Sequence, residues 1–255
     1  MRKILQVNSG ASRREEVSET SYFIFGDYNS SDDLIITRPI VRPSWARDVS
    51  EIAGGSVAKT IQLSRAYSSA SLAVTAVIKD TSAQKLKTIY SSLSGFGRLV
   101  LSSDTSVYMN AVASPLEPVG VSQSMAELDV EFALQPFAYA VEPTVTAVGT
   151  SLTEIVNGGT LFSAPIITLN GGGVGDAVIT VNGVDFRINI TENLVGKPIT
   201  IDCDNEITYY TADGKKYDIN RLTYGDYPLL HIGENYAKFS GKANTVKINV
   251  KERYL

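Results

Sequence analysis

The 255-residue sequence has few of the side chains on which most catalytic and metal chemistry depends. It contains one histidine, His231, and one cysteine, Cys203. A lone cysteine excludes an internal disulfide framework, and one histidine with one cysteine cannot build a zinc site from those ligands. Any reaction that needs an imidazole base would therefore depend on His231 alone.

Two further shortages narrow the possible partners. The 23 Lys and Arg residues are outnumbered by 27 Asp and Glu residues, for a formal net charge of −4. Nucleic-acid-binding surfaces are typically basic, so we expect no sequence-specific nucleic-acid recognition.

The longest apolar run, Leu72 to Ile78, is far shorter than the roughly 20 residues of a membrane-spanning helix. No apolar stretch after Met1 resembles a secretory signal, so we expect synthesis in the cytoplasm without membrane insertion.

Alternation of apolar and polar residues is abundant in the first half. The apolar residues Ala126, Leu128, Val130, Phe132 and Leu134 alternate with the acidic residues Glu127, Asp129 and Glu131. A period of two predicts a half-buried antiparallel strand over Met125–Leu134. Further strands are expected at Tyr22–Phe25, Leu34–Thr37, Ala58–Leu63, Leu72–Lys79, Arg98–Leu101 and Val107–Ala113, the last two joined by the hairpin loop Ser102–Thr105.

Helical spacing occurs in one segment only. Apolar residues recur at Ala83, Leu86, Ile89, Tyr90 and Leu93. Asp80, Thr81 or Ser82 can cap the start, and Gly95 suits a left-handed stop. The pattern predicts one amphipathic helix over about residues 82–94, lying on a sheet.

The second half is richer in glycine and in tight turns. Residues 143–255 hold 13 of the 20 glycines, and Glu142–Thr150 has the character of a linker. Asn182–Gly183 between Ala177–Val181 and Val184–Ile190 is a strong hairpin signal. Asp213–Gly214 marks a second turn, and Thr245–Val250 is expected to be the closing strand. We expect a mainly β protein: an N-terminal β-sandwich-like domain with one helix and a hairpin over residues 1–142 and a C-terminal β-sandwich over residues 143–255.

Two glycine-rich segments superficially resemble phosphate-binding loops. Gly54–Thr60 has alanine, at Ala53 and Ala58, where the phosphate-loop pattern requires glycine, and a strand follows it. Gly171–Gly175 links two strands instead of opening a helix, and so is expected to be a hairpin loop. Neither segment predicts a nucleotide site.

Three further features could take part in metal binding or catalysis. Asp202, Asp204 and Glu206 would share one strand face and could bind Ca²⁺ or supply an acid/base pair, but a solvated face is the simpler interpretation. His231 lies in a Pro- and Gly-flanked loop with no Gly-x-Ser-x-Gly nucleophile, and Cys203, in the strand Ile199–Cys203, is expected to be an inert buried thiol. We assign no catalytic, cofactor-binding or metal-binding residue, and we expect no cofactor and no enzymatic activity.

Aromatic residues leave two alternatives open. Seven tyrosines cluster in the second half, and such rings can bind carbohydrate, form protein interfaces or pack within strands. These are Tyr209, Tyr210, Tyr217, Tyr224, Tyr227, Tyr236 and Tyr254. Trp45 lies between Arg42 and Arg47 after a proline, which suits either an interface anchor or the core.

The order of features along the chain resembles one family. The first half has the turn Phe25–Asp32, the helix ending Leu93–Gly97, the hairpin Leu99–Asp104 and the segment Asp129–Tyr139. The second half has Gly158–Thr160 leading to Ser163–Pro165, Ile201–Cys203, and Gly233–Asn235 leading to Phe239–Gly241. From about residue 22 onward this resembles the distal tail proteins (Dit) of long-tailed, non-contractile bacteriophages. The sequence departs from the family at Ala53–Ser56, where a Pro-Gly-Arg-Asp-Gly-like loop is common.

The resemblance implies a structural function at the phage tail tip, or baseplate. The N-terminal domains would form a homo-hexameric ring under the tail tube protein and leave a channel for DNA. The galectin-like C-terminal domains would project outward and meet tail-tip proteins and receptor-binding or adhesion-device proteins. Two other functions stay open from the residues: a carbohydrate-binding module contacting the host cell wall, and a glycosidase or esterase using Asp202, Asp204 or His231.

Overall fold

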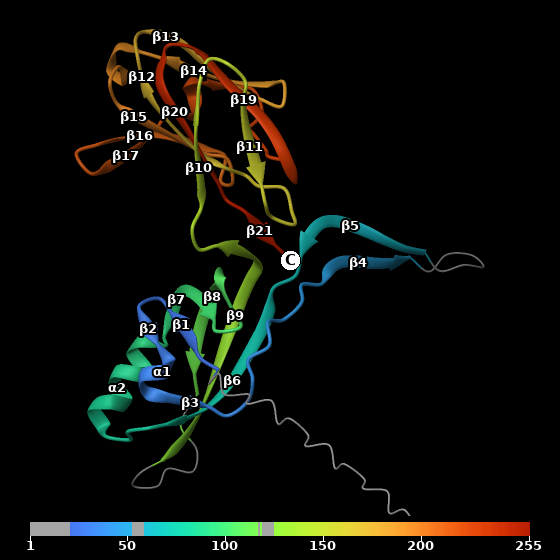
Figure 1. The fold of residues 1–255 in the computed structure, drawn as a ribbon, viewed down its shortest axis with the longest axis vertical. Coiled ribbons are helices and arrows are strands. Elements are labelled where there is room, and N and C mark those ends of the chain that lie inside the picture. Colours follow the sequence, from blue (N-terminus) through green and yellow to red (C-terminus); the bar gives the residue numbers. More distant parts are fainter. Residues whose placement is uncertain (1–20, 53–58, 117, 119–124) are drawn as a thin grey trace, which may run out of the picture.

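Two hydrophobic cores divide the chain. The computed structural model describes residues 21–52, 59–116, 118 and 125–255. The first core gathers buried side chains between Phe23 and Ala138, and the second gathers those between Val148 and Val250. In Figure 1 the two cores correspond to the lower and upper halves of the molecule, which we call the first unit and the second unit.

The first unit is built on one eight-stranded antiparallel sheet. Its strands run in the order β2-β1-β7-β8-β9-β6-β3, and β21 adds to β9. These strands are β1 (Phe23–Phe25), β2 (Tyr28–Asn29), β3 (Leu34–Ile36), β6 (Ala70–Ile78), β7 (Gly95–Leu101), β8 (Asp104–Pro115), β9 (Ala126–Ala140) and β21 (Arg253–Tyr254). Alternate residues of β9 are buried, from Ala126 through Leu134, as the sequence predicts.

One amphipathic helix covers the inner face of this sheet. Helix α2 (Ala83–Ser92) buries Ile89 completely, and Leu93 just beyond it is also fully buried. Gly95 then has a φ of +91°, the left-handed stop that the sequence predicts. Figure 1 shows α2 lying beside β1 and β7.

The second unit is a β-sandwich of two antiparallel sheets. One sheet has the order β10-β20-β12-β15-β16-β17 and the other β11-β19-β13-β14-β18. The first contains β10 (Thr144–Val148), β12 (Ile166–Gly171), β15 (Pro198–Asp202), β16 (Ile207–Ala212), β17 (Lys215–Asp218) and β20 (Ala243–Val250). The second contains β11 (Thr153–Asn157), β13 (Gly175–Val181), β14 (Val184–Ile190), β18 (Thr223–Tyr224) and β19 (Gly233–Gly241). Their facing side chains form the second core.

The predicted hairpin turns of the second unit are present. Asn182 and Gly183 both have positive φ, at 51° and 84°, which is the backbone of a type I′ turn. Asp213 and Gly214 repeat the arrangement, at 51° and 71°, between β16 and β17.

Three predictions about local structure are wrong. The segment Glu142–Thr150 is not merely a linker, because β10 pairs with β20 along its whole length and buries Val148. Gly171–Gly175 is not a hairpin loop, since β12 and β13 belong to different sheets of the sandwich. The helix at residues 83–92 is also not the only one: a four-residue helix, α1 (Ser30–Asp33), follows an Asn29 cap, and two 3₁₀ turns, η1 (Glu192–Leu194) and η2 (Asn220–Leu222), occur in the second unit.

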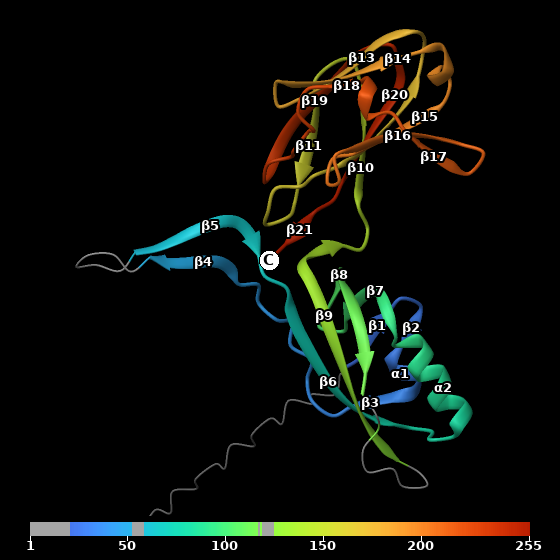
Figure 2. The same ribbon diagram turned by 180° about the vertical axis from the view of Figure 1, so that it is seen from behind.

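A two-stranded hairpin extends away from the two units. Strands β4 (Arg47–Ile52) and β5 (Lys59–Tyr67) pair with each other, and in the described part of the chain neither pairs with another strand. Figures 1 and 2 show the hairpin extending sideways at the level where the two units meet. Its base is closed by a hydrogen bond of 3.0 Å from the Ser68 N–H to the Ala46 carbonyl oxygen.

Candidate assembly interface

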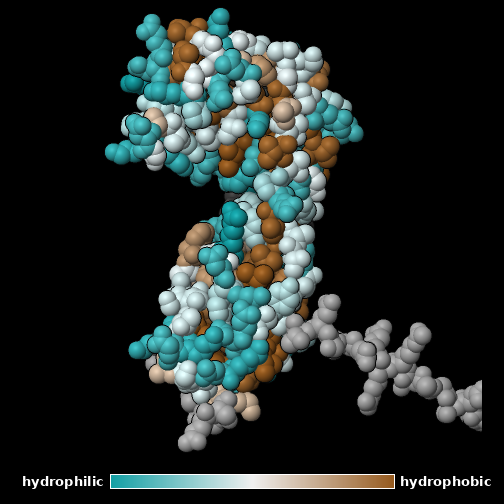
Figure 3. Space-filling model, turned by 60° about the vertical axis from the view of Figure 1, so that its left-hand side comes forward, coloured by the Kyte–Doolittle hydropathy of each residue, from teal (hydrophilic) through white to brown (hydrophobic). Residues whose placement is uncertain are grey.

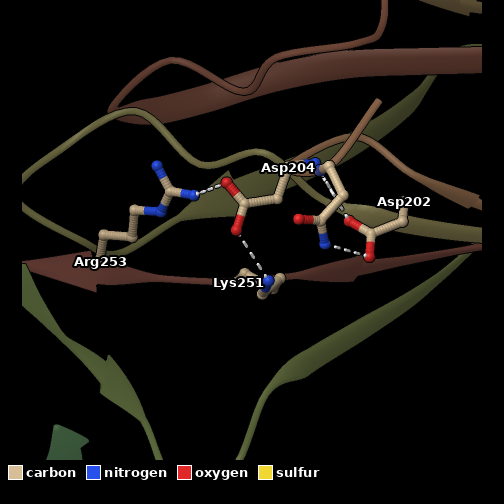
Figure 4. Close-up of polar contacts among 5 residues, drawn as sticks. Asp202, Asp204, Lys251 and Arg253 are labelled. Carbon is tan, nitrogen blue, oxygen red and sulfur yellow. Dashed lines mark hydrogen bonds and ion pairs between the residues drawn. The ribbon is translucent and has the colours of Figure 1, made fainter. Parts of the chain in front are cut away.

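The carboxylates singled out in the sequence do not share a strand face. Strand β15 ends at Asp202, and the chain then turns through Glu206, which has a φ of +53°. Asp202 accepts hydrogen bonds from the backbone N–H groups of Asp204 and Asn205, at 3.2 Å each. Figure 4 shows Asp202 hydrogen-bonded within its own turn, whereas Asp204 points toward Lys251 and Arg253. The predicted strand face is wrong, because the positive φ at Glu206 turns the chain away.

Asp204 is held as a carboxylate by two cations. It pairs with Lys251 at 3.1 Å and makes a second, shorter contact with Arg253. Burial alone would raise the pKa of the Asp204 carboxyl, but the charge and hydrogen bond of Arg253 and the Lys251 ammonium outweigh burial and lower that pKa. Asp204 therefore serves as a structural anion and is not a poised acid or base.

We expect Asp204→Asn to destabilise the protein by about 1.5–3 kcal/mol at neutral pH, the range for hydrogen bonds to charged groups. Because the folded state lowers the pKa of Asp204, this contribution is present above the unfolded pKa of about 3.9 and is lost as pH falls through the folded pKa. Chemical denaturation of both proteins across acidic and neutral pH measures the difference. Asp226→Asn, at an exposed carboxylate, is the control. If the difference in unfolding free energy between the two proteins did not become smaller in acid, this account would be contradicted.

The histidine and the cysteine are not brought together. The side chain of His231 is exposed, and its backbone N–H donates to Asn235 Oδ1 at 2.8 Å. Asn235 is fully buried and donates in return to the carbonyl of His231, so it organises the loop. Cys203 is buried, and burial raises the pKa of its thiol to about 12, as expected of an inert thiol. Within the described ranges, no group of three or more His, Cys, Asp or Glu side chains is arranged to hold a metal ion.

Some tyrosines of the second unit pack on other side chains. Tyr210 stacks on Tyr217 with centroids 5.0 Å apart, and Lys197 lies 4.6 Å over Tyr210. Tyr227 packs against Phe186 at 4.8 Å. Covered faces do not suit the stacking of a sugar ring, although Tyr217, Tyr224 and Tyr236 are exposed.

The remaining sequence features have structural explanations or lie elsewhere. Trp45 is 9% exposed and packs in the first core, so of its two alternatives the structure supports the core. The segment Gly54–Thr60 falls largely outside the described residues, since 53–58 are not among them. No helix in the described part of the chain is long and apolar enough to cross a membrane.

The surfaces that stand out are those suited to contacts between proteins. On the outer face of the first sheet, register places Phe96, Val112 and Ala133 side by side on β7, β8 and β9, and all three are exposed. Phe96 is 65% exposed and Val112 44%. Figure 3 shows apolar side chains on the surfaces of both units. Together with the projecting β4–β5 hairpin, this apolar row defines a candidate assembly interface.

Comparison with solved structures identifies the fold. The crystal structure of the SPP1 Dit protein, described as a paradigm of the hub adsorption apparatus in phages infecting Gram-positive hosts, matches with a TM-score of 0.71 at 14% identity. The match covers 93% of this chain and 100% of that chain. The chain has the Dit fold. The expected fold class, mainly β with a galectin-like C-terminal sandwich, is thereby confirmed.

Two structures of the phage P2 baseplate in its activated conformation show the same fold. The one with Ca matches with a TM-score of 0.57 at 10% identity, over 91% of this chain and 97% of that chain. The one with Sr matches with a TM-score of 0.55 at 9% identity, over 92% and 98%. No protein-family profile and no curated protein matched the sequence. The likeness to the Dit fold is therefore carried by structure over nearly the whole chain.

Sequence reasoning missed the β4–β5 hairpin and the β21 strand as separate features. The expected strand Ala58–Leu63 covers only part of β5 (Lys59–Tyr67), and nothing in its residue pattern says that it leaves the sheet. The two-residue β21 is too short for alternation to reveal. Both elements are fixed by contacts between residues distant in sequence: Ala46 with Ser68 in the hairpin, and Arg253 with Tyr139 for β21.

Proposed function

We propose that this chain is a structural hub of a siphophage tail tip, or baseplate. The observation that supports it most is the likeness to SPP1 Dit, which extends over 93% of this chain and leaves none of that chain unmatched. A likeness over the whole length includes both units, as expected if both serve the same structural function as in that protein. The protein would belong to the virion and act through interfaces, with no chemical step of its own.

In this proposal six copies close into a ring through their first units. A six-membered cyclic ring needs head-to-tail contacts, in which two different surfaces of each copy meet. The β4–β5 hairpin suits one of these surfaces, because an isolated two-stranded hairpin is marginally stable and has two open edges. The apolar row of Phe96, Val112 and Ala133 is a candidate for the other.

The size of the first unit is compatible with a DNA channel. A compact domain of about 130 residues has a radius of gyration near 14 Å, or a diameter of about 36 Å as a sphere. Six such spheres in contact leave a hole of about the same width, which admits a duplex of about 20 Å. With −4 on each copy, six copies carry −24, so the ring would let phosphates pass without holding them.

The two units would face different partners. We propose that residues 1–142 and 143–255 act as two domains, with β21 as the exception that returns to the first sheet. The first unit would contact the tail tube protein. The second unit would project outward and dock tail-tip and receptor-binding or adhesion proteins.

Electron microscopy tests this function directly. Gold-labelled antibodies against the protein are expected to mark the tail extremity of virions that carry it, and the purified protein is expected to form six-fold rings with a central hole of about 36 Å. Because ring proteins can need a neighbour to nucleate, the virion labelling decides. Labelling of the head or of the whole tail shaft would contradict the proposal.

The alternative of a carbohydrate-binding module makes a different prediction. Calorimetry with cell-wall saccharides would then show millimolar or tighter binding confined to the second unit. For the hub we expect no such heat, since the rings of Tyr210, Tyr217 and Tyr227 pack on other side chains of the chain.

A further inference from the structure

The last strand of the chain belongs to neither unit alone. Strand β20 runs through the second unit to Val250, and the chain then crosses to the first unit. There β21 pairs antiparallel with β9, Arg253 opposite Tyr139 and Tyr254 opposite Ala138. The chain thus passes between the units twice, once at 140–144 and once at 250–253, and the two crossings are adjacent because Thr144 pairs with Val250. Figures 1 and 2 show β21 at the joint.

A loop of the second unit grips the backbone of β21 from the other side. The N–H groups of Thr160 and Leu161 both donate to the Arg253 carbonyl, at 2.9 and 3.3 Å. The Leu255 N–H donates to Thr160 Oγ1 at 2.9 Å. At Gly159, a Cβ atom would lie 2.6 Å from the Arg253 oxygen and 2.8 Å from its nitrogen. Only glycine lets this loop approach so closely.

Arg253 places a cation between the two units. It is 7% exposed and pairs with Asp204 of the second unit. Its guanidinium lies 5.8–5.9 Å from the ring centroids of Phe137 and Tyr139 on β9 and of Phe162 in the second unit. A buried guanidinium is costly unless it is paired, so this side chain has little freedom to leave its position.

Residues 251–255 are held by both units. On the first unit, the contacts are the two-residue ladder with β9, the Arg253 guanidinium beside Phe137 and Tyr139, and the Ala140 N–H to the Glu252 carbonyl at 3.3 Å. Tyr254 also packs on the first core, and Arg42 contacts the Leu255 oxygen. The second unit holds the strand through its own chain, the Gly159 loop and Asp204.

We propose that residues 251–255 form a clasp that fixes the angle between the two units. With the clasp in place, the units behave as one rigid body. With it released from either side, they swing about the 140–144 and 250 crossings while each core stays folded. The clasp is a property of the single chain and extends beyond the hub function, since it holds whether or not a ring forms.

Two substitutions release the clasp from opposite sides. Gly159→Ala pushes a methyl group into the Arg253 backbone, and Tyr254→Ala removes the side chain that anchors β21 in the first core. Gly173→Ala is the matched control, because its nearest neighbour would be the flexible Lys242 side chain at 3.8 Å. Spin labels on Lys87→Cys in α2 and Thr211→Cys in β16, both exposed positions, report the distance between units, and buried Cys203 stays unlabelled.

Double electron–electron resonance on the full chain, diluted with unlabelled protein, measures the distance distribution. For the unaltered protein and Gly173→Ala we expect one narrow peak. For Gly159→Ala and Tyr254→Ala we expect a distribution at least about twice as wide, since weakly joined domains move relative to each other by default. Thermal unfolding confirms that both cores persist, and if Gly159→Ala fails to fold, Tyr254→Ala alone decides. Narrow peaks in the folded clasp variants would overturn the proposal, whatever electron microscopy shows of the ring.

Discussion

Removing the β4–β5 hairpin is expected to convert the proposed hexameric ring into single chains. The hairpin pairs with no other described strand of its own chain, so its open edges are free to meet a neighbour. Loss of one half of a head-to-tail contact breaks all six contacts of a ring at once, because every contact is the same. We therefore expect loss of the ring, and not a modest weakening of it.

The paired residues at the base of the hairpin allow it to be replaced by a short turn. Arg47 and Tyr67 are ladder partners at the base of the hairpin, and Ala46 and Ser68 are joined by a hydrogen bond of 3.0 Å. Replacing residues 48–66 by Asn-Gly closes the chain with a type I′ turn and keeps Tyr67, whose ring packs on Phe137 at 5.2 Å. Native mass spectrometry or sedimentation of the purified chain, or of the chain with the proposed tail tube partner, measures the assembly state.

A matched control shortens the other projecting hairpin. Tyr210 and Tyr217 are ladder partners within the β16–β17 hairpin, one pair above Tyr209 and Asp218, so replacing residues 211–216 by Asn-Gly removes its tip. This variant is expected to keep the ring, since it changes the second unit only. Rings that survive the first excision, or disappear in the second, would show that the contacts lie elsewhere.

Truncating one phenylalanine in each core is expected to lower two different unfolding transitions. Phe132 is fully buried in the first core, and its ring centroid lies 5.2 and 5.6 Å from those of Phe23 and Phe25. Phe186 is 1% exposed and contacts Tyr227 in the second core. Each Phe→Ala change is expected to cost about 3–5 kcal/mol through lost burial and the cavity left behind.

Differential scanning calorimetry measures both transitions. For a unit of this size, 1 kcal/mol shifts the midpoint by about 4 °C, so we expect a fall of about 12–20 °C in the affected transition. Phe132→Ala should lower the transition of the first core and leave that of the second core near its original midpoint, and Phe186→Ala should do the reverse. A single transition lowered equally by both would mean that the units unfold together and that two domains are the wrong description.

Local patterns predicted most of the strands because each depends on its own residues. The alternation of Val184–Ile190 and the Asn182–Gly183 turn appear in the structure with the expected bounds and backbone angles. The helix at Ala83–Ser92 and its stop at Gly95 follow from spacing and from the conformational freedom of glycine. These features need no information from elsewhere in the chain.

The errors occur where a distant partner decides the structure. Thr144–Val148 has little apolar pattern of its own and becomes a strand because β20 lies beside it. The short α1 helix depends on the Asn29 cap and on Ser30, whose hydroxyl accepts a hydrogen bond from the Phe23 N–H at 2.9 Å. The role of Asp204 could not be predicted either, because its partners Lys251 and Arg253 are almost fifty residues away.

The position of β21 has a consequence for biosynthesis. The ribosome makes β9 more than a hundred residues before it makes the strand that pairs with it at Arg253 and Tyr254. The nascent first sheet therefore waits, incomplete at that edge, until the whole second sandwich has been synthesised. A chain that stops before Arg253 lacks this strand, so its β9 keeps an unpaired edge at Ala138 and Tyr139.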